Sequence, residues 1–246
     1  MLQTFEVRSV VLMLIKVSLL GIFGLMAVNA YAAENRSIQL TESEHDYLHI
    51  SDSEQQNLDI AGDLTISMWV KPENVTDNMP LISKWNRADK TQYILFLETG
   101  ELGVHLNDES SGYNYSTHRV SHGKNANEWF HVAMVYRAAS GTTELFVDGQ
   151  SLGIDNSAPH AIADTNADFS IGGREDGVTA FKGKIDDVRI WSRSLSATKI
   201  DSIFANPSGF KNGANLQGYW KFNGHLRDQS VNNNDLNFTY STDVPF

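Results

Sequence analysis

The chain has 246 residues, of which 41% are hydrophobic and 20% charged, and it contains no cysteine. The missing cysteine excludes disulfides, zinc–thiolate sites, iron–sulfur clusters and thiol nucleophiles, while the length allows one sizeable core. The formal net charge of −11 argues against a nucleic-acid partner, which calls for a basic surface.

The first 32 residues are predicted to be a signal peptide. Arg8 and Lys16 precede the apolar stretch Val17–Val28, and Ala30 and Ala32 form the small-residue pattern of a cleavage site. We expect cleavage after Ala32, a mature domain over residues 33–246, and export to the periplasm, cell envelope or extracellular space. The alternative is a retained membrane anchor, and the sequence predicts no other membrane contact.

From Ser37 onward, apolar and polar residues alternate, which is typical of half-buried β-strands. Leu64–Lys71 and Trp129–Tyr136 have the pattern over their whole length, and the strand that begins at Thr143 ends at the turn pair Asp148-Gly149. Further strands are expected at Ser37–Leu40, Tyr47–Ile50, Leu81–Lys84, Gln92–Leu97, Leu102–Leu106, Ser116–Val120, Asp168–Ile171, Lys184–Trp191 and Gln217–Phe222.

Only Ser196–Phe204 has a helical pattern, with Ser196 as a suitable N-cap. Many short strands with one short helix predict an all-β fold, a single domain built as a two-sheet antiparallel sandwich.

Four stretches, in this order, carry a family resemblance. They are SEQQNLDIAGDLTISMWVKP (Ser53–Pro72), NEWFHVAMVYRAASGTTELFVDGQSLG (Asn127–Gly153), FKGKIDDVRIWSRSLSATKI (Phe181–Ile200) and LQGYWKFNG (Leu216–Gly224). Together they resemble the laminin-G-like, concanavalin A-like jelly-roll domains of secreted bacterial proteins. The resemblance implies two curved antiparallel sheets and functions in carbohydrate binding, adhesion or protein docking. Asp46 and Tyr47 match the first strand of such domains, but the usual Asp-Gly turn is missing.

Two polar segments hold the candidate ligand-binding residues. Trp85 and Asn86 are expected in a polar loop just past a strand, and Tyr113, Tyr115 and His118 lie in a segment rich in Asn, Asp and Ser. Binding residues are concentrated in loops, and Trp and Tyr suit half-exposed sites for sugars. Alternatively, these rings cover the edge of a sheet and contact no ligand.

Asp186 and Asp187 are unusual because they interrupt the apolar strand GKIDDVRIW (Gly183–Trp191). Strict alternation places Asp186 on one face with Val188 and Ile190, and Asp187 on the other, so that one carboxylate points between the sheets. The family resemblance implies that Asp186 binds a structural Ca²⁺. The alternative is that Asp186 accepts hydrogen bonds from amides while Asp187 pairs with an Arg or Lys.

Catalysis is not predicted. The segment Glu44–His49 is the nearest match to the paired carboxylates of a retaining glycoside hydrolase, and it ends in His where the general acid is needed. No serine-nucleophile or zinc motif is present, and His131 fits a packed strand better than a metal site. The sequence therefore predicts a secreted lectin-like module that binds an extracellular or cell-surface glycan. The alternatives are a protein-interaction or adhesion domain without a sugar site, and an unrecognised hydrolase or lyase.

Overall fold

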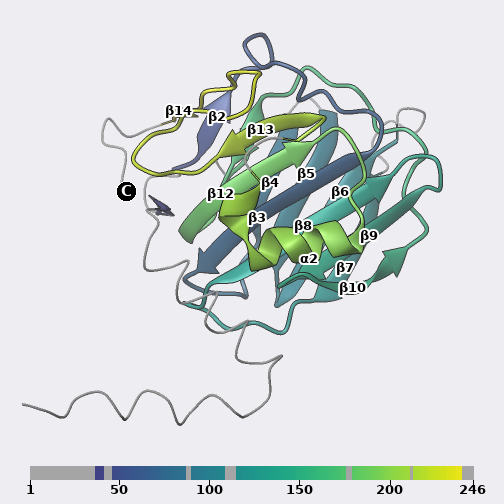
Figure 1. Cartoon of the computed structure of the whole chain (residues 1–246), viewed down its shortest axis with the longest axis horizontal. Coiled ribbons are helices and arrows are strands. Elements are labelled where there is room, and N and C mark those ends of the chain that lie inside the picture. The colour runs from purple at the N-terminus through teal and green to yellow at the C-terminus, as the bar shows by residue number, and fades with distance from the viewer. Residues whose placement is uncertain are drawn as a thin grey trace, which may run out of the picture. The chain divides into compact units, whose positions relative to one another are not determined.

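The fold is an all-β sandwich, as predicted. A computed structural model describes residues 37–41, 46–86, 90–108, 115–175, 179–210 and 213–239, without the side chains of Asn86 and Lys90. The predicted signal peptide lies outside these residues, and the fold belongs to the unit Asn35–Phe246. The described residues form two seven-stranded antiparallel sheets and a single α-helix (Figure 1).

Sheet A has the strand order β1-β12-β3-β8-β9-β10, and β13 also pairs with β12. Its strands are β1 (Ile38–Leu40), β3 (Leu64–Pro72), β8 (Phe130–Arg137), β9 (Thr142–Val147), β10 (Gln150–Asp155), β12 (Gly183–Trp191) and β13 (Leu216–Trp220). Asp148 and Gly149 connect β9 to β10 with φ values of 48° and 76°, which confirms the predicted tight turn.

Sheet B has the strand order β14-β2-β11-β4-β5-β6-β7. Its strands are β2 (Leu48–Ile50), β4 (Met79–Asn86), β5 (Lys90–Glu98), β6 (Glu101–Asn107), β7 (Tyr115–Ser121), β11 (Phe169–Ile171) and β14 (Asn237–Phe238). Alternate residues of these strands, such as Leu95, Leu97 and Val104, join the apolar core together with Ile66 and Met68 of β3. The period-two pattern therefore supplies one buried face from each sheet.

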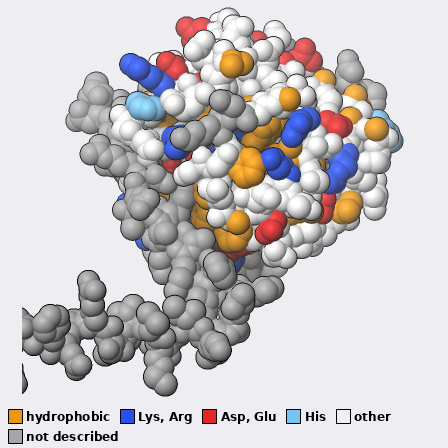
Figure 2. All heavy atoms as spheres, in the orientation of Figure 1, with side chains coloured by type: hydrophobic (Ala, Val, Ile, Leu, Met, Phe, Trp, Pro, Cys, Tyr) orange, Lys and Arg blue, Asp and Glu red, His pale blue; other side chains and the backbone are white. Residues whose placement is uncertain are grey.

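Helix α2 (Ala197–Ala205) covers the other face of sheet A and is followed by the short 3₁₀ helix η2 (Pro207–Gly209). The Ser196 hydroxyl accepts a hydrogen bond from the Lys199 amide at 3.3 Å, which confirms the predicted helix and its N-cap. Phe204 stacks on Trp69 of β3, with ring centres 5.6 Å apart. On this side of the molecule, hydrophobic side chains are interspersed with individual basic and acidic side chains (Figure 2). In the part of the chain that is described, no helix is long and apolar enough to cross a membrane.

A β-bulge in β12 changes the predicted orientation of the two aspartates. Asp186 pairs with Trp69 and Arg189 pairs with Ser67, so β12 has one residue more than β3 in this interval. Asp187 adopts a left-handed conformation with φ of 54°, which Asp tolerates better than most residues. The extra residue returns Val188 to the inter-sheet core. The prediction that Asp186 shares a face with Val188 is therefore wrong.

Asp187 and Arg189 form a buried ion pair beneath α2. Arg189 Nη2 lies 3.1 Å from Asp187 Oδ1 and donates to Pro207 O at 2.6 Å and to the Tyr219 hydroxyl at 2.8 Å. Asp186 Oδ1 accepts a hydrogen bond of 2.8 Å from the Asp187 amide. The pairing of Asp187 with an arginine is as the alternative predicted, whereas the amide that binds Asp186 belongs to the next residue of the same strand and not to a loop.

The Asp187→Asn variant tests the strength of this pair. Asn tolerates the same backbone conformation, so the change removes the negative charge and leaves the buried Arg189 uncompensated. We expect a loss of about 3 kcal/mol in unfolding free energy, measured by urea denaturation. The exposed Asp164→Asn is the control, with an expected change below about 0.5 kcal/mol. Equal effects of the two variants would contradict this role of the ion pair.

His131 gives the fold a predictable acid sensitivity. Burial, and then the nearby Arg189 charge, lowers the pKa of His131 from 6.5 to about 3. The unfolded chain therefore binds a proton between these pH values while the folded chain does not. This lowers stability by about 1.4 kcal/mol for each pH unit as the pH falls from 6.5 towards 3. In His131→Phe, the slope of unfolding free energy against pH between about pH 6 and 4 should be smaller by this amount. An unchanged slope would contradict the role of His131 in acid sensitivity.

Candidate functional site

The outward face of sheet B, which points away from sheet A, carries a row of side chains that crosses every strand of the sheet. Directly paired residues in antiparallel strands lie on the same side. Leu95 and Val104 lie in the core, so the adjacent Ile94 and His105 point outward. The row consists of Asn237, His49, Ser170, Ser83, Ile94, His105 and Thr117.

Three rings lie side by side on this face. The His105 ring centre is 4.6 Å from that of Phe96 and 4.4 Å from that of Tyr115, whose side chain is 51% exposed. The Phe96 ring lies across Gly103, where an added Cβ would come within 2.3 Å of the ring. The Arg119 guanidinium lies 4.9 Å from the centre of the Phe96 ring. Together these groups form an aromatic platform with a cation at one side.

Trp85 lies farther along the same face and is in a strand, not in the predicted loop. Strand β4 continues to Asn86, because Trp85 pairs with Thr91 and Asn86 with Lys90 of β5. Trp85 comes two positions after Ser83 and shares its outward direction. Its ring is half-buried and has the Arg174 guanidinium 4.6 Å from its centre.

Several buried polar groups on this face have no hydrogen-bond partner. They are Ser83 Oγ, both amide atoms of Gln92, and Asn107 Oδ1. Ser83 and Gln92 are fully buried, and Asn107 is 6% exposed. Gln92 is the extra residue of a bulge in β5, since Tyr93 pairs with Lys84 and Thr91 with Trp85. Buried polar groups normally have partners, and bulges often redirect side chains near functional sites.

His105 remains uncharged near neutral pH. Burial, followed by the charge of Arg119, lowers its pKa to about 4, and the opposing effect of Glu98 is smaller. The His105 Nδ1 atom lies 2.9 Å from the Thr117 hydroxyl, which orients the ring. The platform therefore presents a neutral, oriented imidazole.

The structure brings together only some of the predicted ligand-binding residues. Tyr115 and Trp85 lie on the outward face of sheet B, but His118 points to the opposite side of β7, where its Nδ1 lies 3.0 Å from the Thr143 hydroxyl of sheet A. Tyr113 and the side chain of Asn86 lie outside the described residues. The alternation within the predicted strand Gln92–Leu97 could have identified Gln92 and Phe96 as neighbours on one face.

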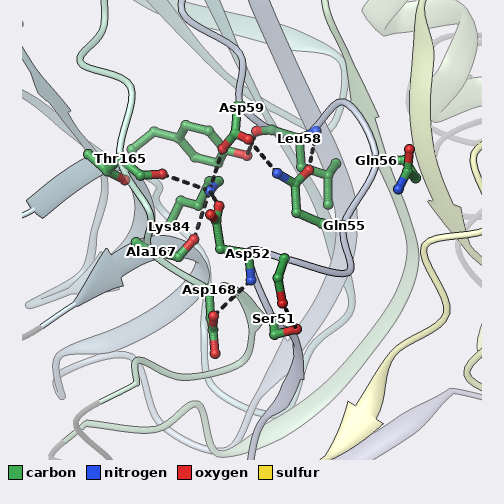
Figure 3. A network of polar contacts seen from close by, with 12 residues as sticks. Ser51, Asp52, Gln55, Gln56, Leu58, Asp59, Lys84, Thr165, Ala167 and Asp168 are labelled. Atoms are coloured by element: carbon green, nitrogen blue, oxygen red, sulfur yellow. Dashed lines mark hydrogen bonds and ion pairs between the residues drawn. The ribbon is translucent and has the colours of Figure 1, made fainter.

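A buried lysine lies directly behind this face (Figure 3). Lys84 is fully buried, and its Nζ pairs with Asp59 and with Asp52 Oδ1, the latter at 2.9 Å. It also donates to Ala167 O at 2.7 Å and to Thr165 O at 3.3 Å. The carboxylates and carbonyls offset the cost of burying the ammonium group.

The Lys84 network fixes the position of the neighbouring site residues. Lys84 lies in β4 between Ser83 and Trp85. Its contacts connect this strand to the segments that hold Asp52 and Ala167. Asp52 also donates its amide to Asp168 Oδ1 at 2.9 Å. Sequence reasoning missed this network because its members are distant in the chain, and nothing local to Lys84 predicts its burial.

The residues around Asp186 offer few ligands for the predicted calcium. One oxygen of Asp186 accepts an amide hydrogen bond, and the adjacent Asp187 carboxylate pairs with Arg189. Across the described ranges, no three His, Cys, Asp or Glu side chains are grouped so that they could hold a metal. Calcium prefers six to eight oxygen ligands, so most of them would have to come from backbone carbonyls and water.

Comparison with known proteins identifies relatives in sequence and in fold. The family model Laminin_G_3, described as concanavalin A-like lectin/glucanases superfamily, matches residues 42–201. The chain is 27% identical over 178 residues to the adhesion G-protein coupled receptor V1 of Danio rerio, which covers 70% of this chain and 3% of the receptor. The chain thus spans only a small part of that relative.

Two solved structures show the same fold. A putative carbohydrate binding protein from Bacteroides ovatus has a TM-score of 0.60 and 18% identity, covering 86% of this chain and 61% of its own. The CBM40 of the Ruminococcus gnavus IT-sialidase, bound to alpha2,3 sialyllactose, has a TM-score of 0.57 and 15% identity, covering 69% of this chain and 96% of its own. At these identities the likeness concerns the fold.

Proposed function

The chain belongs to the Laminin_G_3 family of the concanavalin A-like lectin/glucanases superfamily, and from this premise we propose that it binds carbohydrate through the outward face of sheet B. One observation carries the proposal. Ser83, Gln92 and Asn107 have buried polar atoms without partners on the face that also holds Trp85 and Tyr115. A saccharide offers hydroxyl groups to such atoms and apolar ring faces to the aromatic side chains.

The fold relatives support this proposal. The Bacteroides ovatus protein is described as a putative carbohydrate binding protein, and the Ruminococcus gnavus module was solved with a bound sialylated sugar. Neither is described as a catalytic domain, which favours binding over catalysis for this chain as well.

A second candidate is a protein-interaction or adhesion domain. The relationship to an adhesion receptor favours it, since this chain matches part of that receptor over 70% of its own length. In that case the outward face of sheet B would contact a protein surface, and soluble saccharides would not bind.

We also propose that the protein acts outside the cytoplasm, in the cell envelope or beyond it. The predicted signal peptide over residues 1–32 supports this location, where extracellular glycans are accessible. N-terminal sequencing of the mature protein tests it, and an intact residue 1 on the exported protein would contradict cleavage after Ala32.

Gln92→Leu distinguishes a binding role from a structural one. The variant removes a buried amide that has no partner, so the unfolding free energy should stay the same or rise by up to about 2 kcal/mol. Affinity for the glycan that binds the wild type most tightly in a polysaccharide panel should fall about tenfold or more.

Gln217→Leu is the matched control for this experiment. Gln217 lies in sheet A, and its side chain contacts Ser192 and Asn232, so its loss should reduce stability and leave glycan affinity unchanged. Retained affinity in Gln92→Leu together with a clear loss of stability would contradict the proposed site.

Calcium binding by Asp186 stays a separate prediction. A bound ion stabilises the folded state by mass action, so the Tm should be higher in millimolar calcium than in EDTA. This difference should disappear in Asp186→Asn. Equal Tm values of the wild type in calcium and in EDTA would contradict the calcium site and leave the hydrogen-bonded arrangement as the sole role of Asp186.

A further inference from the structure

The unpartnered polar atoms on the outward face of sheet B differ in whether they donate or accept hydrogen bonds. Gln92 Nε2 can only donate, Gln92 Oε1 and Asn107 Oδ1 can only accept, and the Ser83 hydroxyl can do both. Within the described part of the chain, none of these atoms has a hydrogen-bond partner. A ligand that satisfies them therefore has to supply N–H or O–H donors together with at least one acceptor.

The charge of the ligand is restricted by these atoms and by the neighbouring Arg119. An ionised carboxylate, phosphate or sulfate group offers acceptors alone, so at this position it would leave Gln92 Oε1 and Asn107 Oδ1 unpaired. A cationic group offers donors, but the positive charge of this face repels it: after burial, Arg119 lowers the pKa of His105 most, and the opposing effect of Glu98 is smaller. Neutral hydroxyl groups donate and accept, so they are the groups that satisfy the site.

Gln92 presents both polar atoms of one planar amide. Its side chain is fully buried, and neither Nε2 nor Oε1 has a partner among the described residues. The two atoms are bonded to the same carbon, so one edge of the amide can donate to one hydroxyl and accept from a second hydroxyl next to it. A lone hydroxyl would satisfy one atom and leave the other buried and unpaired, which is unfavourable. Two adjacent hydroxyls satisfy both atoms.

The strand pairing places this amide close to an acceptor and an exposed ring. Tyr93 of β5 pairs with Leu106 of β6, and both lie in the core, so the next residues, Gln92 and Asn107, are neighbours on the outward side. Asn107 pairs in turn with Tyr115 of β7, whose side chain is 51% exposed. A pyranose that lies against the Tyr115 ring can direct the hydroxyls of its edge towards Asn107 and Gln92.

Resting on the proposed carbohydrate function, we propose that the outward face of sheet B selects neutral saccharides with two free hydroxyls on adjacent ring carbons, and that the Gln92 amide binds both hydroxyls. Asn107 Oδ1 accepts a hydrogen bond from a further hydroxyl of the same ligand. Each pyranose within a β-1,4-linked chain keeps its C2 and C3 hydroxyls as such a pair. In a β-1,3-linked chain the linkage uses the C3 oxygen, and no adjacent pair remains.

The test compares neutral polysaccharides that contain the same sugar in the two linkages. Cellulose, β-1,4-galactan and β-1,4-xylan are each compared with the β-1,3-linked glucan, galactan or xylan in depletion isotherms with the folded protein. We expect the wild type to bind at least one β-1,4-linked polymer about tenfold or more tightly than the β-1,3-linked polymer of the same sugar.

Gln92→Leu separates recognition of the hydroxyl pair from recognition of chain shape. The two linkages give chains of different shape, and a preference that arises from shape would persist in this variant. Because the amide binds the hydroxyl pair, the affinity for the β-1,4-linked polymer should fall to that for the β-1,3-linked polymer, which should not change. Gln92→Met, whose side chain has nearly the same length, repeats the comparison with a closer match in shape.

Gln217→Leu is again the matched control, since Gln217 lies in sheet A and contacts Ser192 and Asn232. It should keep the preference of the wild type. Equal binding of the two linkages by the wild type, or binding of charged or β-1,3-linked polymers alone, would overturn the inference and leave the proposed carbohydrate function intact. An undiminished preference in both Gln92 variants would do the same. Folded wild-type protein that binds no saccharide would overturn both.

Discussion

Each strand of sheet B has to place one face in the apolar core, and this requirement leaves the opposite face for other interactions. Leu95, Leu97 and Val104 meet the residues of β3 between the sheets. The alternate positions hold Ser83, Ile94, His105 and Thr117, which the strand pairing aligns in one row. Hydrophobic burial thus sets the register, and the register determines which polar and aromatic side chains become neighbours.

The two sheets use their outer faces differently. Helix α2 covers the outer face of sheet A: it buries Ile200 and Ile203 in a cluster with Trp191, and its Phe204 stacks on Trp69. Within the described residues, no helix covers the outward face of sheet B. The side chains of sheet A therefore meet protein on both faces, with the core on one side and α2 on the other.

Buried polar groups fall into two classes in this molecule. Lys84 is surrounded by four oxygen partners, and Arg189 by Asp187, Pro207 and Tyr219, so both stabilise the fold. Gln92 and Ser83 lie close to Lys84 in the sheet but have no partners. An unpaired buried amide is destabilising, and the proposed carbohydrate site would give the Gln92 amide a partner.

The sequence by itself determined the fold class, the short helix and most strands, because alternation and capping are local properties. It also placed Trp85 and Tyr115 among the candidate binding residues. Only the tertiary structure decided the bulge at Asp187, which places Val188 on the opposite face from Asp186, and the ion pairs of the buried Lys84 with Asp52 and Asp59. The reason is physical: bulges and buried ion pairs depend on residues that are far apart in the chain and meet only after the sheets have formed.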